Sequence, residues 1–583
     1  MINAFINNIP VEVKEGTTIL DAAKATGIKI PTLCHHPDLN ASAACGLCIV
    51  KIKNRNNKII RACATAIEEG MQITTHDPDI LKTRKIILEM ILSDHPNDCL
   101  QCGRNGTCEL QKLLADFDIR EQRFDRIKHD IEPDNSTRAI LLNPDKCIKC
   151  GRCIEVCQNM QNVWALTFLN RGINTRFAPS GDINLAESPC VKCGQCSAHC
   201  PVGAIYEYNE IDKALDALND EDKYCVVQIA PAVRVALGEA FGMDPGTNLT
   251  LKIYAALRRL GFKGVFDTNF GADVTVMEES SEFINRLVNN KGSLPLITTC
   301  CPSWVDFMEK KYPDMIGHFS SCKSPHEIVG VLSKTYFAKM NDIDPAKIFM
   351  VSIMPCTSKK YEISRSDEMY ASGYKDVDVV LTTRELARVI KQAGLDIASM
   401  QDELPDHMLG KYSGAGVIFG ASGGVMEAAL RTANYFITGK NLDNLEFNDI
   451  RGLDGVKETK VTIQNREIKI AIAQGLNNVE YVLNKIRDAK ENNKPMPYDF
   501  IEVMACHGGC IAGGGQPYGI DDNVRILRAQ ALFDADRNKE GLRCSHENPY
   551  IKKLYNEFLM KPLSKTSEEL LHTTYKGRKL YKK

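Results

Sequence analysis

One run of cysteines occurs twice in this chain, with the same spacing each time. CIKCGRCIEVC at 147–157 and CVKCGQCSAHC at 190–200 share the spacing C-x2-C-x2-C-x3-C, so the segment is an internal duplication. In iron–sulfur modules with this spacing, the fourth cysteine of each run ligates the cluster of the other run. A zinc interpretation would have to account for eight thiolates in this crossed order, so we predict two [4Fe–4S] clusters. The predicted ligand sets are Cys147, Cys150, Cys153 with Cys200, and Cys190, Cys193, Cys196 with Cys157.

The composition favours a metalloprotein over a disulfide-bonded protein. The chain has 583 residues, 23 of them cysteine, and is too long for a single hydrophobic core. Disulfide scaffolds are typically short and secreted, whereas this long chain opens with no basic segment followed by an apolar stretch. Its formal net charge of −2 gives no reason to expect nucleic acid binding, and no apolar run reaches membrane-spanning length. We therefore expect a cytosolic, multidomain protein with no nucleic acid or membrane partner.

Residues 1–80 have the pattern of a small β-rich domain around four more cysteines. Short segments such as AFINNIPVEV and IVKIKN are separated by Asn/Gly turns, with one helix near TILDAAKATG. Soft sulfur ligands select either zinc or iron–sulfur, and this spacing alone leaves both open. The iron–sulfur module further along the chain favours a [2Fe–2S] cluster held by Cys34, Cys45, Cys48 and Cys63.

Residues 81–126 begin with a segment of helical periodicity, LKTRKIILEMILSDHP, that Pro96 ends. An H-x3-C-x2-C-x5-C pattern overlaps its end and continues beyond it. A single histidine beside a proline is more often a loop residue than a ligand, but three cysteines leave a four-ligand site one short. Because iron–sulfur chemistry is expected next to it, we interpret the pattern as a [4Fe–4S] site with the ligands His95, Cys99, Cys102 and Cys108.

Residues 210–583 change to an α/β pattern with isolated cysteines. Strand-like runs (KYCVVQIA, KIFMVSIM, GVIFGA, DFIEVMA) alternate with helical segments such as AVRVALGEAF and GGVMEAALR. Ligands gather outside the carboxyl ends of strands in open α/β sheets, so residues distant in sequence can meet there. Four cysteines that follow apolar strands therefore form one more predicted four-thiolate site: Cys301, Cys356, Cys506 and Cys510. Cys300 should point to the opposite face of an extended backbone, which leaves it for another role.

The sequences around these strand ends resemble a known family. TTCCPSW, MPCTSKK and MACHGGCIAGGGQP look like the three signatures of [FeFe]-hydrogenases, and the preceding modules have the order of the long monomeric clostridial type. The similarity runs from end to end and includes SHENPYIKKLYNEFL. It implies that the four cysteines hold a [4Fe–4S] cubane, and that Cys510 also bridges to a di-iron subcluster with CO, cyanide and dithiolate ligands. This assembly is the H-cluster, whose di-iron part maturation proteins would install.

The resemblance, together with the motifs, predicts a multidomain α+β fold. A small β-rich [2Fe–2S] ferredoxin-like domain at 1–80 precedes a His/Cys-ligated [4Fe–4S] domain at 81–126. A two-cluster bacterial ferredoxin-like domain at 127–209 then precedes a large α/β catalytic domain at 210–583. The active site is expected between two lobes of this last domain.

The resemblance also implies roles for residues around the di-iron unit, whose few protein ligands leave its orientation to surrounding groups. Lys359 would donate to a cyanide, Ala230 and Pro231 would line the site, and Met354 and Met504 would pack near the irons. The alternatives are that the methionines fill the core and that Lys359 is a surface cation.

A proton route is implied in the same way. It runs from Cys300 through Glu279, Ser320 and Glu282 toward solvent near Arg286. A thiol has a reference pKa of ~8.5, close enough to neutral to give and take a proton. Glu279 and Glu282 lie three residues apart and hence on one helical face, for which an ordinary solvated surface is the alternative.

The expected activity is the reversible reduction of protons to H2 by a monomer, with electrons from reduced ferredoxin or flavodoxin passing along the iron–sulfur chain. The catalytic subunit of an NADH/ferredoxin-linked complex would use a very similar chain. An electron-transfer subunit similar to that of NADH dehydrogenase would lack the three signatures, and a hydrogen sensor would carry a signalling domain. A non-enzymatic iron–sulfur assembly factor is the remaining alternative, against which Cys300 and Lys359 argue.

Several positions depart from the family's common pattern without removing a ligand. His507 stands where proline is familiar, in the loop between two cubane ligands, where it could hydrogen-bond a sulfur. His326 stands where glutamine is usual. Other differences are Thr299, Ser303 and Ala232. Three cysteines receive no function, and the first of them is expected to be an inert buried thiol: Cys225, Cys322 and Cys544.

Overall fold

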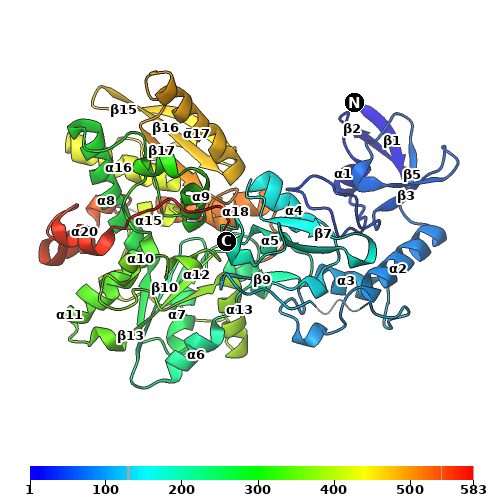
Figure 1. Cartoon of the computed structure of the whole chain (residues 1–583), viewed down its shortest axis with the longest axis horizontal. Helices are drawn as coiled ribbons and strands as arrows, with labels where there is room; N and C mark the ends of the chain where they lie inside the picture. Colours follow the sequence, from blue (N-terminus) through cyan, green and yellow to red (C-terminus); the bar gives the residue numbers. More distant parts are fainter. Residues whose placement is uncertain (128–130, 540, 582–583) are drawn as a thin grey trace.

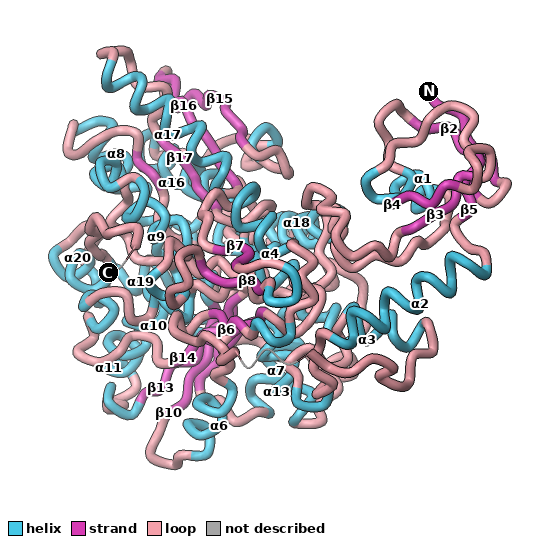
Figure 2. The backbone as a smooth tube through the Cα atoms, turned by 45° about the vertical axis from the view of Figure 1, so that its right-hand side comes forward, coloured by secondary structure: helices cyan, strands magenta, loops and turns pink. Residues whose placement is uncertain are grey.

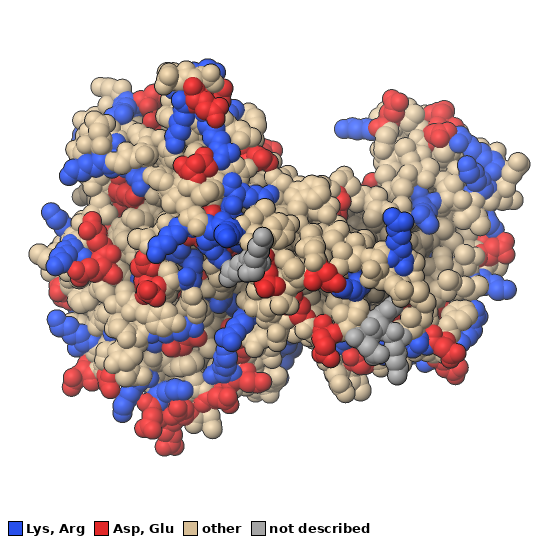
Figure 3. All heavy atoms as spheres, viewed as in Figure 1, with Lys and Arg blue, Asp and Glu red and all other residues tan. Residues whose placement is uncertain are grey.

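The computed structural model describes residues 1–127, 131–539 and 541–581. The N-terminal residues form a separate lobe that projects from a much larger body, and a loop-rich middle segment connects the two (Figure 1). Acidic and basic side chains are interspersed over the visible face (Figure 3), in keeping with a net charge of −2. None of the helices in the described ranges is long and apolar enough to cross a membrane.

The N-terminal lobe is a five-stranded sheet in the order β2-β1-β5-β3-β4 with its own apolar core. Its elements are β1 (Ile2–Ile6), β2 (Ile9–Val13), α1 (Ile19–Ala25), β3 (Ile49–Ile52), β4 (Lys58–Arg61) and β5 (Gln72–Thr74). Asn7 and Asn8, with φ of 51° and 67°, make the two-residue turn of the first hairpin. Thr18 caps α1 by accepting a hydrogen bond from the Asp21 N–H. The β-rich pattern and the single helix predicted here are confirmed.

The next segment is helical and continues into the duplicated module. It contains α2 (Pro78–Ser93), a 3-10 turn (Cys99–Gln101) and α3 (Glu109–Asp116). In Figure 2, α2 and α3 lie below the N-terminal sheet and beside the larger body. Asp77 caps α2 through the Ile80 N–H, and the helix ends before Pro96 as predicted.

The internal duplication is visible in the backbone. Two small antiparallel sheets hold the cysteine runs: β6 (Ile140–Leu142) pairs with β9 (Ile205–Glu207), and β7 (Leu166–Leu169) pairs with β8 (Arg176–Pro179). Each run starts a short helix from a left-handed glycine: Gly151, φ 80°, before α4 (Arg152–Glu155), and Gly194, φ 73°, before α5 (Gln195–His199). Only glycine adopts this conformation without strain, so both repeats use the same turn.

The larger body contains two four-stranded sheets. The first is wholly parallel, in the order β11-β10-β13-β14, and the second has the order β12-β17-β16-β15, with only β15 antiparallel. The strands are β10 (Tyr224–Ile229), β11 (Gly264–Asp267), β12 (Leu296–Ile297), β13 (Ile348–Met354), β14 (Val379–Thr382), β15 (Val456–Ile463), β16 (Arg466–Gln474) and β17 (Phe500–Met504). The central strands are buried along almost their whole length, as parallel strands covered on both faces must be.

Helices cover both sheets, and α8 (Thr268–Asn289) is the longest of those described. It packs against α10 (Pro325–Leu332), α15 (Gly414–Ile418) and α16 (Gly424–Thr438). The other helices are α6 (Ile211–Asn219), α7 (Thr250–Arg259), α9 (Pro302–Lys311), α11 (Ala338–Met340), α12 (Lys359–Glu362), α13 (Thr383–Gln392), α14 (His407–Gly410) and α17 (Leu476–Glu491). The C-terminal helices α18 (Asp522–Arg537), α19 (Pro549–Leu554) and α20 (Lys565–Leu571) return to pack on α15, α8 and α10.

Two predicted elements of this body are wrong. GVIFGA, expected as a strand, lies in α15 and the turn after it, because a short apolar run buried on all sides fits a buried helix as well as a strand. AVRVALGEAF, expected as a helix, is a turn followed by a 3-10 segment (Leu237–Phe241), with Arg234 drawn inward to the Asp267 carboxylate. KYCVVQIA, KIFMVSIM and DFIEVMA are confirmed as β10, β13 and β17, and the multidomain α+β fold class is confirmed.

Candidate active site and cluster sites

A cavity opens where the carboxyl ends of strands from both sheets meet. The cavity and the solvent at its mouth together make up about 760 Å³ of space free of protein atoms. Its wall includes residues that follow β10, β12, β13 and β17, together with the start of a 3-10 segment at Cys510. Four predicted metal ligands line this one cavity: Cys301, Cys356, Cys506 and Cys510. They come from three strand ends, more than 50 residues apart along the chain at each step.

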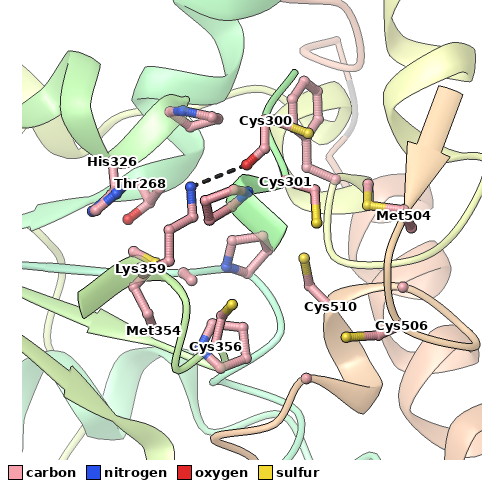
Figure 4. A pocket seen from close by; sticks show the side chains of 18 of the residues that line it. Thr268, Cys300, Cys301, His326, Met354, Cys356, Lys359, Met504, Cys506 and Cys510 are labelled. Carbon is pink, nitrogen blue, oxygen red and sulfur yellow. Dashed lines mark hydrogen bonds between the residues drawn. The ribbon is translucent and has the colours of Figure 1, made fainter. Parts of the chain in front are cut away.

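The thiols of this cavity share one buried environment (Figure 4). Burial raises the pKa of Cys356 to about 12, and the neighbouring Cys301 thiol adds to the rise. Burial also raises the pKa of Cys510, with further contributions from Cys301 and Cys356. Figure 4 shows the side chains of Cys300 and Cys301 on different sides of the chain. Unmetallated, four such thiols would stay protonated at neutral pH, and a soft metal centre would replace those protons.

Lys359 reaches this cavity from the first turn of α12. Its ammonium donates to the Cys300 carbonyl oxygen at 3.0 Å, the dashed line in Figure 4, and to Glu362 Oε2 at 2.7 Å. Burial disfavours the charged form, but Glu362 outweighs it and raises the pKa of Lys359. The side chain is therefore a buried, charged donor, and the surface-cation alternative is wrong for its location. Among the described residues it has two hydrogen-bond acceptors, so one of its three N–H groups is free to face the cavity.

The remaining predicted neighbours of the di-iron unit also lie in the cavity wall: Ala230, Pro231, Met354, Met504 and His326. His326 Nε2 lies 2.8 Å from Glu362 Oε2, and its Nδ1 lies 3.2 Å from Ser352 Oγ. Burial, and then the nearby Lys359 ammonium, lowers the pKa of His326 to about 4, so the imidazole is neutral at pH 7. Through Nε2, the imidazole of His326 contacts the Glu362 carboxylate that also accepts from Lys359.

The residues of the predicted proton route form a row that starts beside the cavity. Glu279 is buried on α8, and burial raises its pKa to about 8 against the opposing effect of the Ser320 hydroxyl. Ser320 Oγ donates to Glu282 Oε2 at 3.1 Å, and Arg286 Nη2 donates to Glu282 Oε1 at 2.5 Å. In the described part of the chain, Glu279 Oε1 has no hydrogen-bond partner. The solvated-surface alternative is thus wrong for Glu279.

Two further cavities separate the duplicated cysteines into the crossed sets that their spacing predicts. One is lined by Cys147, Cys150, Cys153 and Cys200, and the other by Cys157, Cys190, Cys193 and Cys196. The second set lies beside the large cavity. Gln195, between Cys193 and Cys196, donates through its side-chain amide to Cys506 Sγ at 3.1 Å. No local sequence pattern indicates this contact, since it joins segments more than 300 residues apart.

Two more groups of predicted ligands lie nearer the N-terminus. Cys48 Sγ lies 3.3 Å from Cys63 Sγ, and the Cys45 N–H donates to Cys34 Sγ at 3.5 Å. The Cys34 thiol also contacts the Cys63 thiol, so the four cysteines gather at one place in the N-terminal lobe. His95 is buried after α2, and its Nδ1 has no hydrogen-bond partner among the residues that the structure describes. A buried ring nitrogen without a partner is rare in proteins and is the group a metal would use. Cys99, Cys102 and Cys108 follow within the next turns.

The residues that depart from the family pattern lie in different surroundings. His507 Nε2 lies 3.2 Å from Asp522 Oδ1, and burial lowers the pKa of His507. The Thr299 hydroxyl donates to the Ser320 carbonyl at 3.1 Å, beside the proton row. Cys225 is a buried thiol on β10, as predicted. Ser303, Ala232, Cys322 and Cys544 are buried as well.

Glu362 is a site residue that sequence reasoning missed. It lies three residues after Lys359 on α12, and burial opposes its ionisation while Lys359 lowers its pKa to about 2. The i,i+3 spacing of Lys359 and Glu362 in KKYE predicts an ion pair, because oppositely charged residues at this spacing meet on one helical face.

Family models match this chain along most of its length. Residues 223–514 match the iron only hydrogenase large subunit, C-terminal domain, and residues 522–578 match the iron hydrogenase small subunit. A 2Fe-2S iron-sulfur cluster binding domain matches residues 1–78, and a 4Fe-4S dicluster domain matches residues 146–204. Residues 84–123 match the NADH-ubiquinone oxidoreductase-G iron-sulfur binding region.

Individual relatives agree with these matches. The chain is 46% identical to the NADP-reducing hydrogenase subunit HndD of Solidesulfovibrio fructosivorans over 99% of each chain. It is 39% identical to iron hydrogenase 1 of Clostridium pasteurianum, over 99% of this chain and all of that one. The solved structure of apo [FeFe]-hydrogenase HydA1 from Chlamydomonas reinhardtii aligns with a TM-score of 0.56 and 40% identity, covering 63% of this chain and 98% of that one. The chain therefore belongs to the [FeFe]-hydrogenase family, oxidoreductases whose catalytic domain is joined here to iron–sulfur cluster domains.

Proposed function

We propose that this chain interconverts protons and H2 at an H-cluster whose cubane is held by four thiolates. The observation that carries the proposal is that Cys301, Cys356, Cys506 and Cys510 line one cavity together with Cys300 and Lys359. Four soft sulfur donors in a buried site suit a [4Fe–4S] cluster, and Cys510 is the one proposed to bridge to the di-iron unit. When bound, this group supplies the stored electrons and the open iron positions at which protons are reduced or H2 is split.

The wall of the cavity suits a group with few protein ligands. Ala230, Pro231, Met354 and Met504 are apolar or polarisable and keep water away from it. The free N–H of Lys359 would donate to an anionic ligand such as cyanide and so fix the orientation of the di-iron unit. Glu362 and the Cys300 carbonyl hold the ammonium in place for this contact.

Protons would travel along the row that begins at Cys300. Its thiol, Glu279, the Ser320 hydroxyl and Glu282 are groups that give and take protons, and Arg286 holds Glu282 at the outer end. Glu279 and Ser320 are fully buried, with 1% and 0% exposure, whereas 13% of the Glu282 side chain is exposed. Contact of Glu282 with solvent supports a path that enters the protein at this residue.

Electrons would arrive through one [2Fe–2S] and three [4Fe–4S] clusters in the domains 1–80, 81–126 and 127–209. Ser42 Oγ donates to the Cys150 carbonyl at 3.1 Å, and Arg104 Nη1 donates to the Cys200 carbonyl at 2.8 Å. Ser42 belongs to the loop between Cys34 and Cys45, and Arg104 to the loop between Cys102 and Cys108. Both N-terminal sites thus contact the cavity that Cys150 and Cys200 line. From there the route would pass to the site of Cys193 and then to the catalytic domain, 210–583.

Two kinds of electron partner fit the proposed function. Reduced ferredoxin or flavodoxin is the first candidate for a monomer acting alone. The second is a nicotinamide-linked complex, favoured by 46% identity over 99% of the chain to a relative named as an NADP-reducing hydrogenase subunit. The purified chain should exchange electrons with ferredoxin without other proteins if the first holds. Activity with NADPH or NADH that appears only when partner subunits are added would support the second.

The infrared spectrum of the protein, expressed with its maturation proteins, tests the proposed active site. Bands from CO and cyanide should appear together with H2 evolution. A non-enzymatic assembly factor would load iron but give neither. Absence of these bands from a fully iron-loaded protein would refute the proposed function.

A further inference from the structure

Gln195 occupies an unusual position between two of the cysteine sites. It lies between Cys193 and Cys196, and its side chain is buried, with 3% exposure. Its amide Nε2 donates to Cys506 Sγ at 3.1 Å and to the Ala512 carbonyl at 2.9 Å. One side chain therefore starts within the ligand run of one site and ends on a ligand sulfur of the next.

The backbone around Gln195 is fixed against the catalytic domain at van der Waals distance. A Cβ on Gly194 would lie 2.4 Å from Thr357 Oγ1, and a Cβ on Gly514 would lie 2.4 Å from the Cys193 carbonyl oxygen. The Thr357 hydroxyl also donates to the Lys192 carbonyl at 2.7 Å. Side chains at either glycine would force the two loops apart, so Gln195 has one well-defined place from which to reach Cys506.

From this geometry we propose that Gln195 is a positioning residue that joins the last accessory cluster to the catalytic cluster and raises the reduction potential of the latter. The proposal rests on the proposed function, in which Cys506 is a cubane ligand. Reduction adds one negative charge to a cluster, and part of that charge resides on its sulfur ligands. An N–H dipole aimed at sulfur stabilises the reduced form more than the oxidised form, especially in a buried site.

The amide also gives the electron a short connected path between the two centres. The neighbouring contacts at Thr357, Ser358 and Gly514 involve backbone carbonyls of the Cys193 loop and no ligand sulfur. Gln195 is thus expected to affect the potential of the catalytic cluster and its electron exchange with the neighbouring cluster, while the proton route, which starts from Cys300, stays unchanged.

An infrared redox titration of the matured protein tests the proposal, because the CO and cyanide bands report only on the catalytic cluster. Gln195→Leu removes both donors at similar size, and Gln195→Glu replaces the donor with a group that cannot donate when ionised. We expect each change to disfavour reduction of the catalytic cluster by about tenfold, which lowers its midpoint by about 59 mV for a one-electron couple.

Gln161→Leu is the matched control. Gln161 is also a buried glutamine and lines the cavity of Cys157 and Cys190, but it makes no hydrogen bond to Cys506. Its replacement should change the reduction equilibrium constant of the catalytic cluster by less than twofold.

The outcomes separate this inference from the proposed function. If the wild-type protein lacks CO and cyanide bands, the proposed function fails. If the bands are present and neither Gln195 variant changes the reduction equilibrium constant of the catalytic cluster by more than twofold, the inference is overturned. It is also overturned if both variants fail to load the catalytic cluster, since Gln195 would then be a structural support only.

Discussion

Replacing Glu279 with glutamine removes one titratable group from the interior of the catalytic domain and preserves its size. The side chain is buried on α8 with Oε1 unpartnered among the described residues, next to the cavity that contains Cys300. Burial raises the pKa of Glu279 to about 8. At pH 7 roughly ten of these carboxyls are protonated for each one that is ionised.

That balance suits a group that passes protons in both directions near neutral pH. A positioned acid–base group contributes roughly 10²–10⁴-fold to a rate, so Glu279→Gln should lower H2 evolution by at least about a hundredfold. The sign of the pH dependence follows from the same pKa. The protonated carboxyl, which donates, prevails below pH 8 and is lost above it, so wild-type H2 evolution should fall roughly tenfold for each unit above about pH 8.

The assay is H2 evolution from reduced methyl viologen, normalised to the intensity of the CO and cyanide bands. Glu278→Gln is the control, because Glu278 is the neighbouring buried carboxyl but accepts from Tyr555 and the Leu563 N–H, at 2.6 and 2.8 Å, away from the proton row. Its turnover per assembled site should stay within a fewfold of wild type. If Glu279→Gln keeps more than a tenth of wild-type turnover with intact bands, Glu279 is not on the proton route.

Three further substitutions test other parts of the site. Cys300→Ala should leave iron content and infrared bands unchanged while lowering turnover by more than about a hundredfold; substantial remaining activity would show that the thiol is not the relay. Glu362→Gln leaves the buried Lys359 ammonium without its carboxylate, a loss of about 3 kcal/mol for such pairs. It should lower the melting temperature and shift the cyanide bands, and unshifted bands would mean that Lys359 does not contact cyanide. His507→Pro should change the ratio of H2 evolution to H2 oxidation, and identical ratios would exclude His507 from setting that bias.

The sequence predicted the parts of the site that local spacing or strand order determines. The crossed cysteine sets follow from the ligand spacing of a duplicated run, and the meeting of Cys301, Cys356 and Cys506 follows from the carboxyl ends of buried strands. Both are general consequences of chain geometry. The individual roles of these residues stay predictions.

The rest depends on tertiary contacts that leave no trace in a local pattern. GVIFGA is apolar on every side, so its sequence period could not separate the observed helix α15 from a strand. Gln195 reaches Cys506 only because Gly194 and Gly514 allow their loops to touch. Glu362 was within reach of a helical-spacing argument, but its importance appears only once Lys359 is seen to be buried beside it.

Anomalous diffraction at the iron edge from crystals of the matured protein would show whether the four strand-end cysteines hold one cluster. We expect one group of iron peaks within bonding distance of Sγ of Cys301, Cys356, Cys506 and Cys510, with further iron next to Cys510 and with the Cys300 sulfur beside it but unbound. Iron peaks that leave any of these four sulfurs without a bond, or that lie bonded to Cys300, would contradict it.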